Sequence, residues 1–212
     1  MELPEVVVGV LLAGGRSSRM GGGDKCLLPL AGRPILARTI DRLSPQVSDL
    51  IINANGDLAR FSAFDLPIIE DRLGGHIGPL AGVHAGIAWA RAKRPKSRFV
   101  ITAATDTPFF PSDLVSRFCS AIKDSEPRLL VARSEEGVHQ VFGLWPVTLA
   151  SALEDSLASG IRKVGDWVKA HGAEEVTFPP EKIGEQLIDP FFNINCPEDL
   201  AEAEALLQRS TS

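Results

Sequence analysis

The sequence predicts an α/β fold, in which a mostly parallel central sheet is covered by helices on both faces. Short apolar runs of strand length alternate along the chain with longer stretches of helical spacing. The first run, residues 6–12, is continuous and rich in valine, which is typical of a strand buried on both faces. The 212 residues, 44% hydrophobic and 23% charged, suit one globular domain with a full core.

The expected elements follow in order, each bounded by prolines, glycines or polar residues. Apolar runs predict strands at 6–12, 50–54, 67–70, 98–104, 129–132, 138–144 and 175–178, with a further short one at 192–195. Helical spacing predicts helices at 35–43, 80–92, 114–122, 148–158, 161–170 and 197–208. These elements predict a single-domain, Rossmann-like, three-layer fold over residues 1–212, frayed after residue 208.

The loop after the first strand, residues 12–25, is the most informative segment. It holds five glycines, two arginines and one lysine in fourteen residues. Glycines let the backbone approach a ligand and direct N–H groups at it, and arginine and lysine suit phosphate oxygens. A merely mobile surface loop does not need cations between glycine clusters. We therefore interpret the segment as a phosphate-binding loop.

This loop matches neither of two common phosphate-binding patterns. A P-loop requires serine or threonine after its Gly-Lys pair, but here Asp24 precedes Lys25 and Cys26 follows it. The dinucleotide fingerprint requires a third glycine after Gly21 and Gly23, where Cys26 stands instead. The sequence therefore indicates a third kind of phosphate loop.

Charge and cysteine content exclude several classes of partner. The net charge of −5 provides no general attraction to nucleic acid or to anionic membranes, so neither is expected as a partner. The apolar runs are far shorter than the roughly 20 residues of a membrane span. Residues 1–5 lack the basic start of a signal peptide, and Cys26, Cys119 and Cys196 are widely scattered. These features predict a cytoplasmic protein with reduced thiols.

Polar residues stand where the predicted parallel strands end. Asn53 and Asn55 end the second strand, and Glu70, Asp71 and Arg72 follow the third. Ligands of open α/β sheets bind at the carboxyl ends of the strands, which favours a binding role. Asn53 also suits a turn, and Asp71 could pair with Arg72 in solvent, so a structural explanation stays open for both.

Asp106 is the strongest candidate for a metal ligand. It follows a buried strand and precedes the turn at Pro108. One carboxylate beside a polyphosphate can bind Mg²⁺, because phosphates and waters supply the other ligands. A helix-capping role is the alternative, but Asp106 lies several residues before the next helix. The sequence contains no common nucleophile motif, which fits metal-assisted transfer to an incoming phosphate.

Two other features have both a functional and a structural explanation. Residues 78–82, Gly-Pro-Leu-Ala-Gly, open a predicted helix whose N–H groups could face a ligand. The same glycines could instead permit close packing of the helix on the sheet. His139 lies on a predicted strand, where a structural role is the more common one.

Five motifs follow one another across nearly the whole chain. They are Leu-Ala-Gly-Gly at 12–15, Arg-Met-Gly-Gly-x-Asp-Lys at 19–25, Gly-Pro-Leu-Ala-Gly at 78–82, Asp-x-Pro at 106–108 and Asn-x-Asn-x-Pro-Glu-Asp-Leu at 193–200. With these motifs the chain closely resembles the MobA family of molybdenum cofactor guanylyltransferases, within the nucleotidyltransferase superfamily. The first motif alone would indicate only the superfamily.

The resemblance implies Mg²⁺-dependent transfer of GMP from GTP to molybdenum-bound molybdopterin, with release of pyrophosphate. It implies contacts with other proteins of molybdenum cofactor biosynthesis or with its target proteins. It also implies catalysis by Lys25, Asp106 and Arg19, of which Asp106 also binds the Mg²⁺. The implied nucleotide-binding residues are Leu12, Ala13, Gly14, Gly15, Lys25, Asn53, Asp71, Gly78 and Asp106.

The resemblance further divides the domain into a nucleotide-binding half, about residues 1–110, and an acceptor half, about residues 111–208. Candidates for the pterin-binding site are Arg162, Lys163, Asn193 and Asn195. A solvated helix face explains Arg162 and Lys163 equally well. Gln140 replaces a proline that often follows the strand histidine in the family, and Cys196 replaces a threonine. Both departures concern pterin contacts.

Two alternatives are open, one within the same superfamily and one in another functional class. Related enzymes transfer a cytidylyl group, but their loop resembles Leu-Ala-Ala-Gly, and Gly14 here takes the place of the second alanine. This difference favours GTP over CTP. A GTP-binding adaptor without turnover is the other alternative. Lys25 and Asp106 argue against it, because a sensor does not need a metal ligand beside the leaving group.

Overall fold

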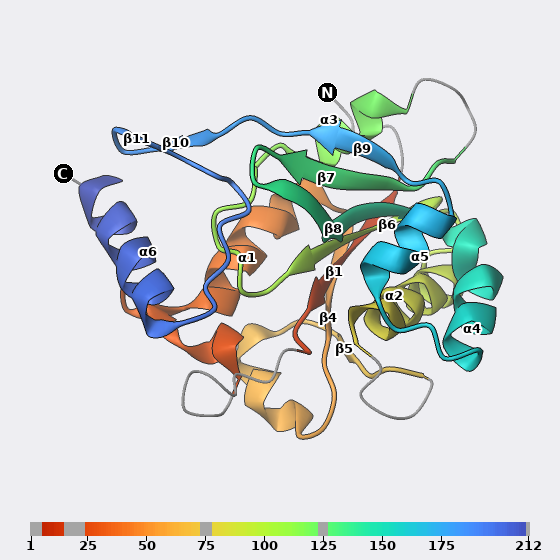
Figure 1. The fold of residues 1–212 in the computed structure, drawn as a ribbon. Coiled ribbons are helices and arrows are strands. Elements are labelled where there is room, and N and C mark those ends of the chain that lie inside the picture. Colours follow the sequence, from red (N-terminus) through yellow and green to blue (C-terminus); the bar gives the residue numbers. More distant parts are fainter. Residues whose placement is uncertain (1–5, 15–23, 73–77, 123–126, 211–212) are drawn as a thin grey trace.

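The computed structural model describes residues 6–14, 24–72, 78–122 and 127–210. Its centre is a seven-stranded sheet in the order β5-β4-β1-β6-β8-β7-β9 (Figure 1). The first four strands in this order are parallel: β5 (Ile68–Ile69), β4 (Asp49–Asn53), β1 (Val7–Leu12) and β6 (Phe99–Ala104). The other three are β8 (Gly137–Pro146), antiparallel to β6 and β7, then β7 (Leu130–Ser134) and β9 (Glu174–Thr177), which pair in parallel. The predicted α/β fold with a mostly parallel sheet is confirmed.

Strand β1 is buried on both faces, as its run of valines predicts. Val7 and Leu11 face one apolar cluster, and Val8 and Val10 face another. Burying a valine or leucine side chain contributes roughly 1.5–3 kcal/mol, so this strand is central to stability.

Helices cover both faces of the sheet and complete three layers (Figure 1). The first cluster includes residues of α1 (Ile35–Leu43) and α3 (Leu114–Ala121). The second includes residues of α2 (Pro79–Lys93), α4 (Ala150–Ala158) and α5 (Val164–Ala170). Helix α5 begins three residues later than the sequence predicts. No helix among the described residues combines the length and apolar character needed to cross a membrane.

A third, smaller cluster lies between α6 (Pro197–Ser210), the start of α1 and two short hairpins. The hairpins are β2 (Pro29–Leu30) with β3 (Arg33–Pro34), and β10 (Glu181–Ile183) with β11 (Gln186–Ile188). Neither hairpin is predicted from the sequence, because strands of two or three residues are too short to show an alternating pattern. The strand predicted at 192–195 is wrong, since that segment forms no ladder.

The order of the strands creates a switch point between β1 and β6. From β1 the chain moves outward to β4 and β5, then returns to place β6 on the other side of β1. Helices leave the sheet in opposite directions at such a point, and a crevice opens at the carboxyl ends of the two strands. The predicted site residues at the ends of β1 and β6 therefore flank this crevice.

Candidate active site

A cavity of about 290 Å³ lies at the carboxyl ends of β1, β4 and β6. Its lining includes all the described residues that the sequence assigns to nucleotide binding: Leu12, Ala13, Gly14, Lys25, Asn53, Asp71, Gly78 and Asp106. Gly15, the remaining residue of that prediction, and Arg19, predicted as catalytic, lie outside the described residues. Residues far apart in the sequence thus meet in one pocket.

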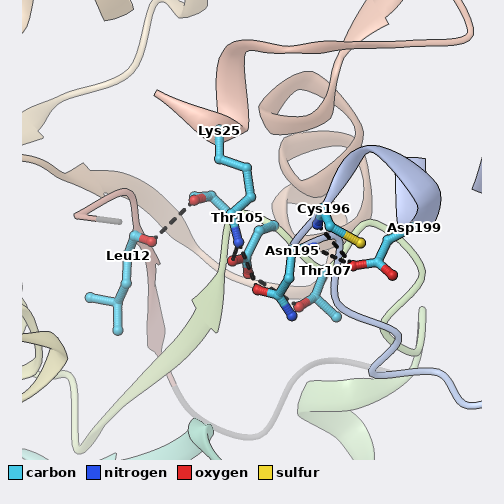
Figure 2. A network of polar contacts seen from close by, with 8 residues as sticks. Leu12, Lys25, Thr105, Thr107, Asn195, Cys196 and Asp199 are labelled. Atoms are coloured by element: carbon cyan, nitrogen blue, oxygen red, sulfur yellow. Dashed lines mark hydrogen bonds and ion pairs between the residues drawn. The ribbon is translucent and has the colours of Figure 1, made fainter. Parts of the chain in front are cut away.

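Lys25 and Asp106 form the polar centre of the site, and Figure 2 shows Lys25 beside its second partner, Asn195. The Lys25 Nζ donates to Asp106 Oδ2 at 2.8 Å and to Asn195 Oδ1 at 2.9 Å. Only 13% of the Lys25 side chain and 24% of the Asp106 side chain are exposed. The N–H of Ile194 donates to the backbone oxygen of Asp106 at 2.9 Å, so the C-terminal segment is joined to both charged residues.

Asp106 fits the role of ligand to a nucleotide-bound divalent cation. Among the described residues, its Oδ1 is contacted only by the Thr107 hydroxyl at 3.5 Å, which leaves an acceptor oxygen available to a ligand. Among the described residues, no group of three or more histidines, cysteines, aspartates or glutamates could hold a metal by itself. A cation at Asp106 would therefore take most of its ligands from phosphates and water, as Mg²⁺ commonly does.

Asp71 follows β5, on the other side of β1 from Asp106, and is held by two asparagines. Its Oδ1 accepts from Asn53 Nδ2 at 3.0 Å, and its Oδ2 accepts from Asn55 Nδ2 at 2.8 Å. The Asp71 N–H donates in return to Asn55 Oδ1 at 2.9 Å. The carboxylate is thereby fixed in place, with lone pairs left on both oxygens for a ligand. It does not form the solvent-exposed pair with Arg72 that was the structural alternative.

The glycines of residues 78–82 have different roles. Gly78 lines the cavity with φ of +81°, a conformation that favours glycine, at the N-terminus of α2. Gly82 lies against the sheet, where a Cβ would be 2.2 Å from Asn53 Oδ1 and 2.7 Å from Leu12 Cδ2. Each of the two explanations for this motif therefore applies to one of its glycines. Gly82 allows close packing on the sheet, and Gly78 forms part of the cavity wall.

The structure adds lining residues that the sequence did not assign to the site. Cys26 and Thr105 are among them. The Thr105 Oγ1 donates to the Leu12 backbone oxygen at 3.1 Å and so joins the ends of β1 and β6. Burial, together with the nearby charge of Asp24, raises the pKa of the Cys26 thiol to about 12, so the thiol stays protonated. Asn55, which was predicted with Asn53 at a strand end, also lines the cavity.

The four pterin-site candidates lie in two places. Asn193 lines the cavity, and Asn195 contacts Lys25. The Arg162 guanidinium donates to the Leu157 backbone oxygen at 2.7 Å and so caps the end of α4. The Arg162 backbone oxygen lies 3.6 Å from where a Cβ on Gly78 would be, at the edge of the cavity. Lys163 is exposed just before α5.

His139 has the structural contacts that its position in a strand favours. Its Nε2 lies 2.7 Å from Ser134 Oγ, and its ring stacks on Phe191 with 4.4 Å between centroids. Burial lowers the pKa of His139, so the neutral imidazole is favoured.

Comparison with known proteins identifies the family. Residues 9–175 match the family model described as MobA-like NTP transferase domain. A molybdenum cofactor guanylyltransferase of Mesorhizobium japonicum is 46% identical over 97% of this chain and 98% of its own. One from Rhodopseudomonas palustris is 48% identical over 95% of this chain and 94% of its own.

A solved structure shows the same fold. It is the molybdopterin-guanine dinucleotide biosynthesis protein A of Archaeoglobus fulgidus, with a TM-score of 0.73 and 24% identity over 96% of this chain and 100% of that one. The match to the family model and the identity to full-length relatives agree with the cavity at the switch point. The chain belongs to the MobA-like family of molybdenum cofactor guanylyltransferases and is a nucleotidyltransferase.

Proposed function

We propose that the protein transfers GMP from GTP to molybdenum-bound molybdopterin, forming the guanine dinucleotide form of the cofactor and releasing pyrophosphate. The names of the relatives support this activity. Within this chain, the observation that carries the proposal is the Asp71 carboxylate, held in the cavity by Asn53 and Asn55.

The Asp71 carboxylate complements guanine better than cytosine. Guanine presents two adjacent donors, its N1–H and its 2-amino group, and a carboxylate is purely an acceptor. Cytosine presents acceptors at the corresponding ring nitrogen and carbonyl, which would face the negative oxygens. Because two amide groups already fix the carboxylate, it loses little conformational entropy when a base binds.

The proposed chemistry follows from the charges of Lys25 and Asp106. An oxygen of the acceptor's terminal phosphate attacks the α-phosphorus of GTP, and the bond from that phosphorus to the β-phosphate oxygen breaks. The attacking phosphate is already anionic, so a general base is not required. Lys25, with Arg19 from the same loop, would neutralise charge on the α-phosphate and on the departing pyrophosphate. A divalent cation bound at Asp106, which we propose to be Mg²⁺, supplies further neutralisation when present.

The acceptor would approach from the C-terminal half, about residues 111–208. Asn193 and Asn195 lie at the cavity already, and Arg162 and Lys163 lie at or near its edge. We propose that these residues contact the pterin phosphate and ring. Reduced thiols at all three cysteines support a cytoplasmic reaction. Cytoplasmic partners that supply or receive the cofactor are part of the same proposal.

Nucleotide preference tests the proposal directly. Pyrophosphate release is measured with purified protein, molybdenum-loaded molybdopterin and, in turn, GTP, CTP, ATP and UTP. We expect GTP to be strongly preferred. We expect Asp71→Asn to reduce kcat/KM for GTP roughly 10- to 100-fold, because hydrogen bonds to charged groups contribute about 1.5–3 kcal/mol. A wild-type preference for CTP would reject guanylyl transfer.

The adaptor alternative is tested with Asp106→Asn. This variant keeps the shape of the side chain but loses its charge, so we expect the fold to be retained and transfer to be lost. Unchanged transfer by Asp106→Asn would remove the metal-binding assignment. GTP binding without any transfer by the wild-type protein would instead favour an adaptor.

A further inference from the structure

Arg60 is a charged residue outside the cavity lining that contacts the lining residue Asn55 and also Asp24, the neighbour of the lining residue Lys25. It lies in the 3-10 segment η3 (Leu58–Phe64), after strand β4. Its guanidinium forms an ion pair with Asp24, donates to the Asn55 backbone oxygen at 3.0 Å through Nη2 and contacts the Asp57 backbone oxygen through Nη1. The Arg60 and Asp24 side chains are only 22% and 23% exposed.

On one side, Arg60 contacts the residue that precedes Lys25. Asp24 begins the 3-10 turn η1 (Lys25–Leu27), and its backbone oxygen accepts from the Leu27 N–H at 3.0 Å. Aspartates at such positions often cap the turn with their side chain. The Asp24 side chain makes no capping hydrogen bond and instead pairs with Arg60. Arg60 therefore fixes the start of the turn that presents Lys25.

On the other side, Arg60 contacts the base-binding wall. The Asn55 backbone oxygen accepts from Arg60, while the Asn55 side chain exchanges two hydrogen bonds with Asp71. A single planar guanidinium thus links Asn55 and Asp24. It is itself held over the buried ring of Phe61, with 4.5 Å from Arg60 Cζ to the ring centroid.

We propose that Arg60 is a positioning residue that couples occupancy of the base site at Asp71 to the position of Lys25. This inference rests on the proposed function, because it assigns the base to Asp71 and the phosphates to Lys25. A base that engages Asp71 stabilises Asn55 and, through Arg60, the turn that carries Lys25. The identity of the base then affects kcat as well as KM.

Arg60 also has an electrostatic effect that can be measured separately. Without it, the Asp24 carboxylate would stand uncompensated beside the residue that binds the triphosphate. Any cation at position 60 would relieve that repulsion. Only arginine offers a rigid planar cation that can pair with Asp24 while one of its N–H groups donates to Asn55, so only arginine can hold the two together. Charge should therefore act mainly on KM, and the double contact on kcat.

The test compares Arg60→Met, Arg60→Lys, Asp24→Asn and the double variant Asp24→Asn with Arg60→Met. The kcat and KM for GTP are measured, together with binding of GTP by calorimetry. We expect Arg60→Met to raise KM and to lower kcat roughly 10-fold, within the range of measured coupling between contacting residues. Arg60→Lys, and the addition of Asp24→Asn to Arg60→Met, should restore KM but not kcat.

Arg94→Met is the matched control. Arg94 forms a comparable ion pair with Asp49, 2.6 Å from Nε to Oδ2, at the start of β4, whereas Asn53 and the site lie at its end. We expect this variant to keep the wild-type kcat and KM. A general loss of folded protein would lower kcat in every variant and would not separate KM from kcat.

Two results would overturn the inference. Wild-type kcat and KM in Arg60→Met would show that Arg60 does not position the site. Full recovery of kcat by Arg60→Lys would show that charge alone is sufficient. If Arg60→Met does not fold, the kcat of Arg60→Lys and of Asp24→Asn decides between these outcomes. A wild-type protein that prefers CTP would reject the proposed function instead, and the same variants would then be compared with CTP.

Discussion

Gly82 packs so closely against Asn53 that even a methyl group at this position should disturb the site. An added methyl group would lie 2.2 Å from Asn53 Oδ1, so the Asn53 side chain would have to move. Asn53 holds Asp71, and its movement should weaken GTP binding. We expect Gly82→Ala to destabilise the fold by roughly 1–3 kcal/mol through overpacking and to reduce the preference for GTP over CTP.

Gly86→Ala is the control for this prediction. Gly86 lies one turn later on α2, and its added Cβ would be 2.6 Å from Val10 Cγ2 in the core of β1. The steric cost is similar, but the neighbour is not a cavity residue. Denaturant unfolding should show comparable losses in both variants, and only Gly82→Ala should change the GTP to CTP ratio. An equal change of that ratio in both would count against a specific role for Gly82.

The segment 189–195, the C-terminal segment that reaches Lys25, is anchored at both ends. At one end Asp189 accepts from the Ser134 hydroxyl and, at 2.6 Å, from the Phe191 N–H. At the other end Asn195 contacts Lys25. Because the single hydroxyl hydrogen of Ser134 goes to Asp189, His139 Nε2 must be the donor to Ser134 Oγ. Ser134 therefore links His139 to Asp189 and is not an activated nucleophile.

Removing the Ser134 hydroxyl should affect the active site, although Ser134 does not line the cavity. We expect Ser134→Ala to lower stability by about 1–3 kcal/mol, because the half-buried Asp189 loses a hydrogen-bond partner. Transfer should fall through misplacement of Asn195 beside Lys25. Thermal unfolding and the kcat for GTP measure the two effects. Ser120→Ala, which removes an exposed hydroxyl bonded only within α3, should leave both near wild type.

The same segment shows where sequence reasoning reaches its limit. The strand β1 and the helix α2 were predicted because long apolar patterns record burial directly. The segment 192–195 was predicted as a strand from its composition, yet its Ile194 N–H bonds to the Asp106 backbone instead of a ladder. Asn195 was predicted to contact the acceptor. Its contact with Lys25, which lies 170 positions away in the sequence, forms only when the chain is folded. Local pattern cannot encode such long-range contacts.

For the site too, residues placed by a local pattern were predicted, and a residue placed by long-range contacts was not. Asn53, Asp71 and Asp106 were predicted because they stand at strand ends, which any parallel sheet brings to one edge. Arg60 was not predicted, since its segment has neither a motif nor a strong period. Its partners, Asp24 and Asn55, become neighbours only when the fold is complete.

At the scale of the whole molecule, two histidines make stability depend on pH. Burial lowers the pKa of His84 and of His139 below the ordinary value of 6.5. For His84, the charge of Arg72 acts in the same direction, and those of Glu154 and Asp71 oppose it. The unfolded chain therefore takes up protons near pH 6.5, where the folded protein does not. Stability from this source is complete above that pH and decreases as the pH falls below it.

Urea unfolding at about pH 7.5 and at about pH 5.5 measures this dependence. We expect the free energy of unfolding to fall on acidification, and to fall less in His84→Gln, whose side chain cannot be protonated. The Nδ1 of His84 is buried without a hydrogen-bond partner among the described residues, which is consistent with a neutral ring. Identical pH dependence in both proteins would exclude His84 as a source.

The ion pair between Lys25 and Asp106 gives the proposed metal site an internal positive charge. Before any ligand arrives, the ammonium group already balances the carboxylate. A divalent cation arriving alone must compete with this internal charge, so it should bind weakly. A nucleotide changes the competition, because its phosphates offer the ammonium a new partner and leave Asp106 available. Cation and nucleotide should therefore bind with positive cooperativity, and the enzyme should discriminate against futile loading with metal alone.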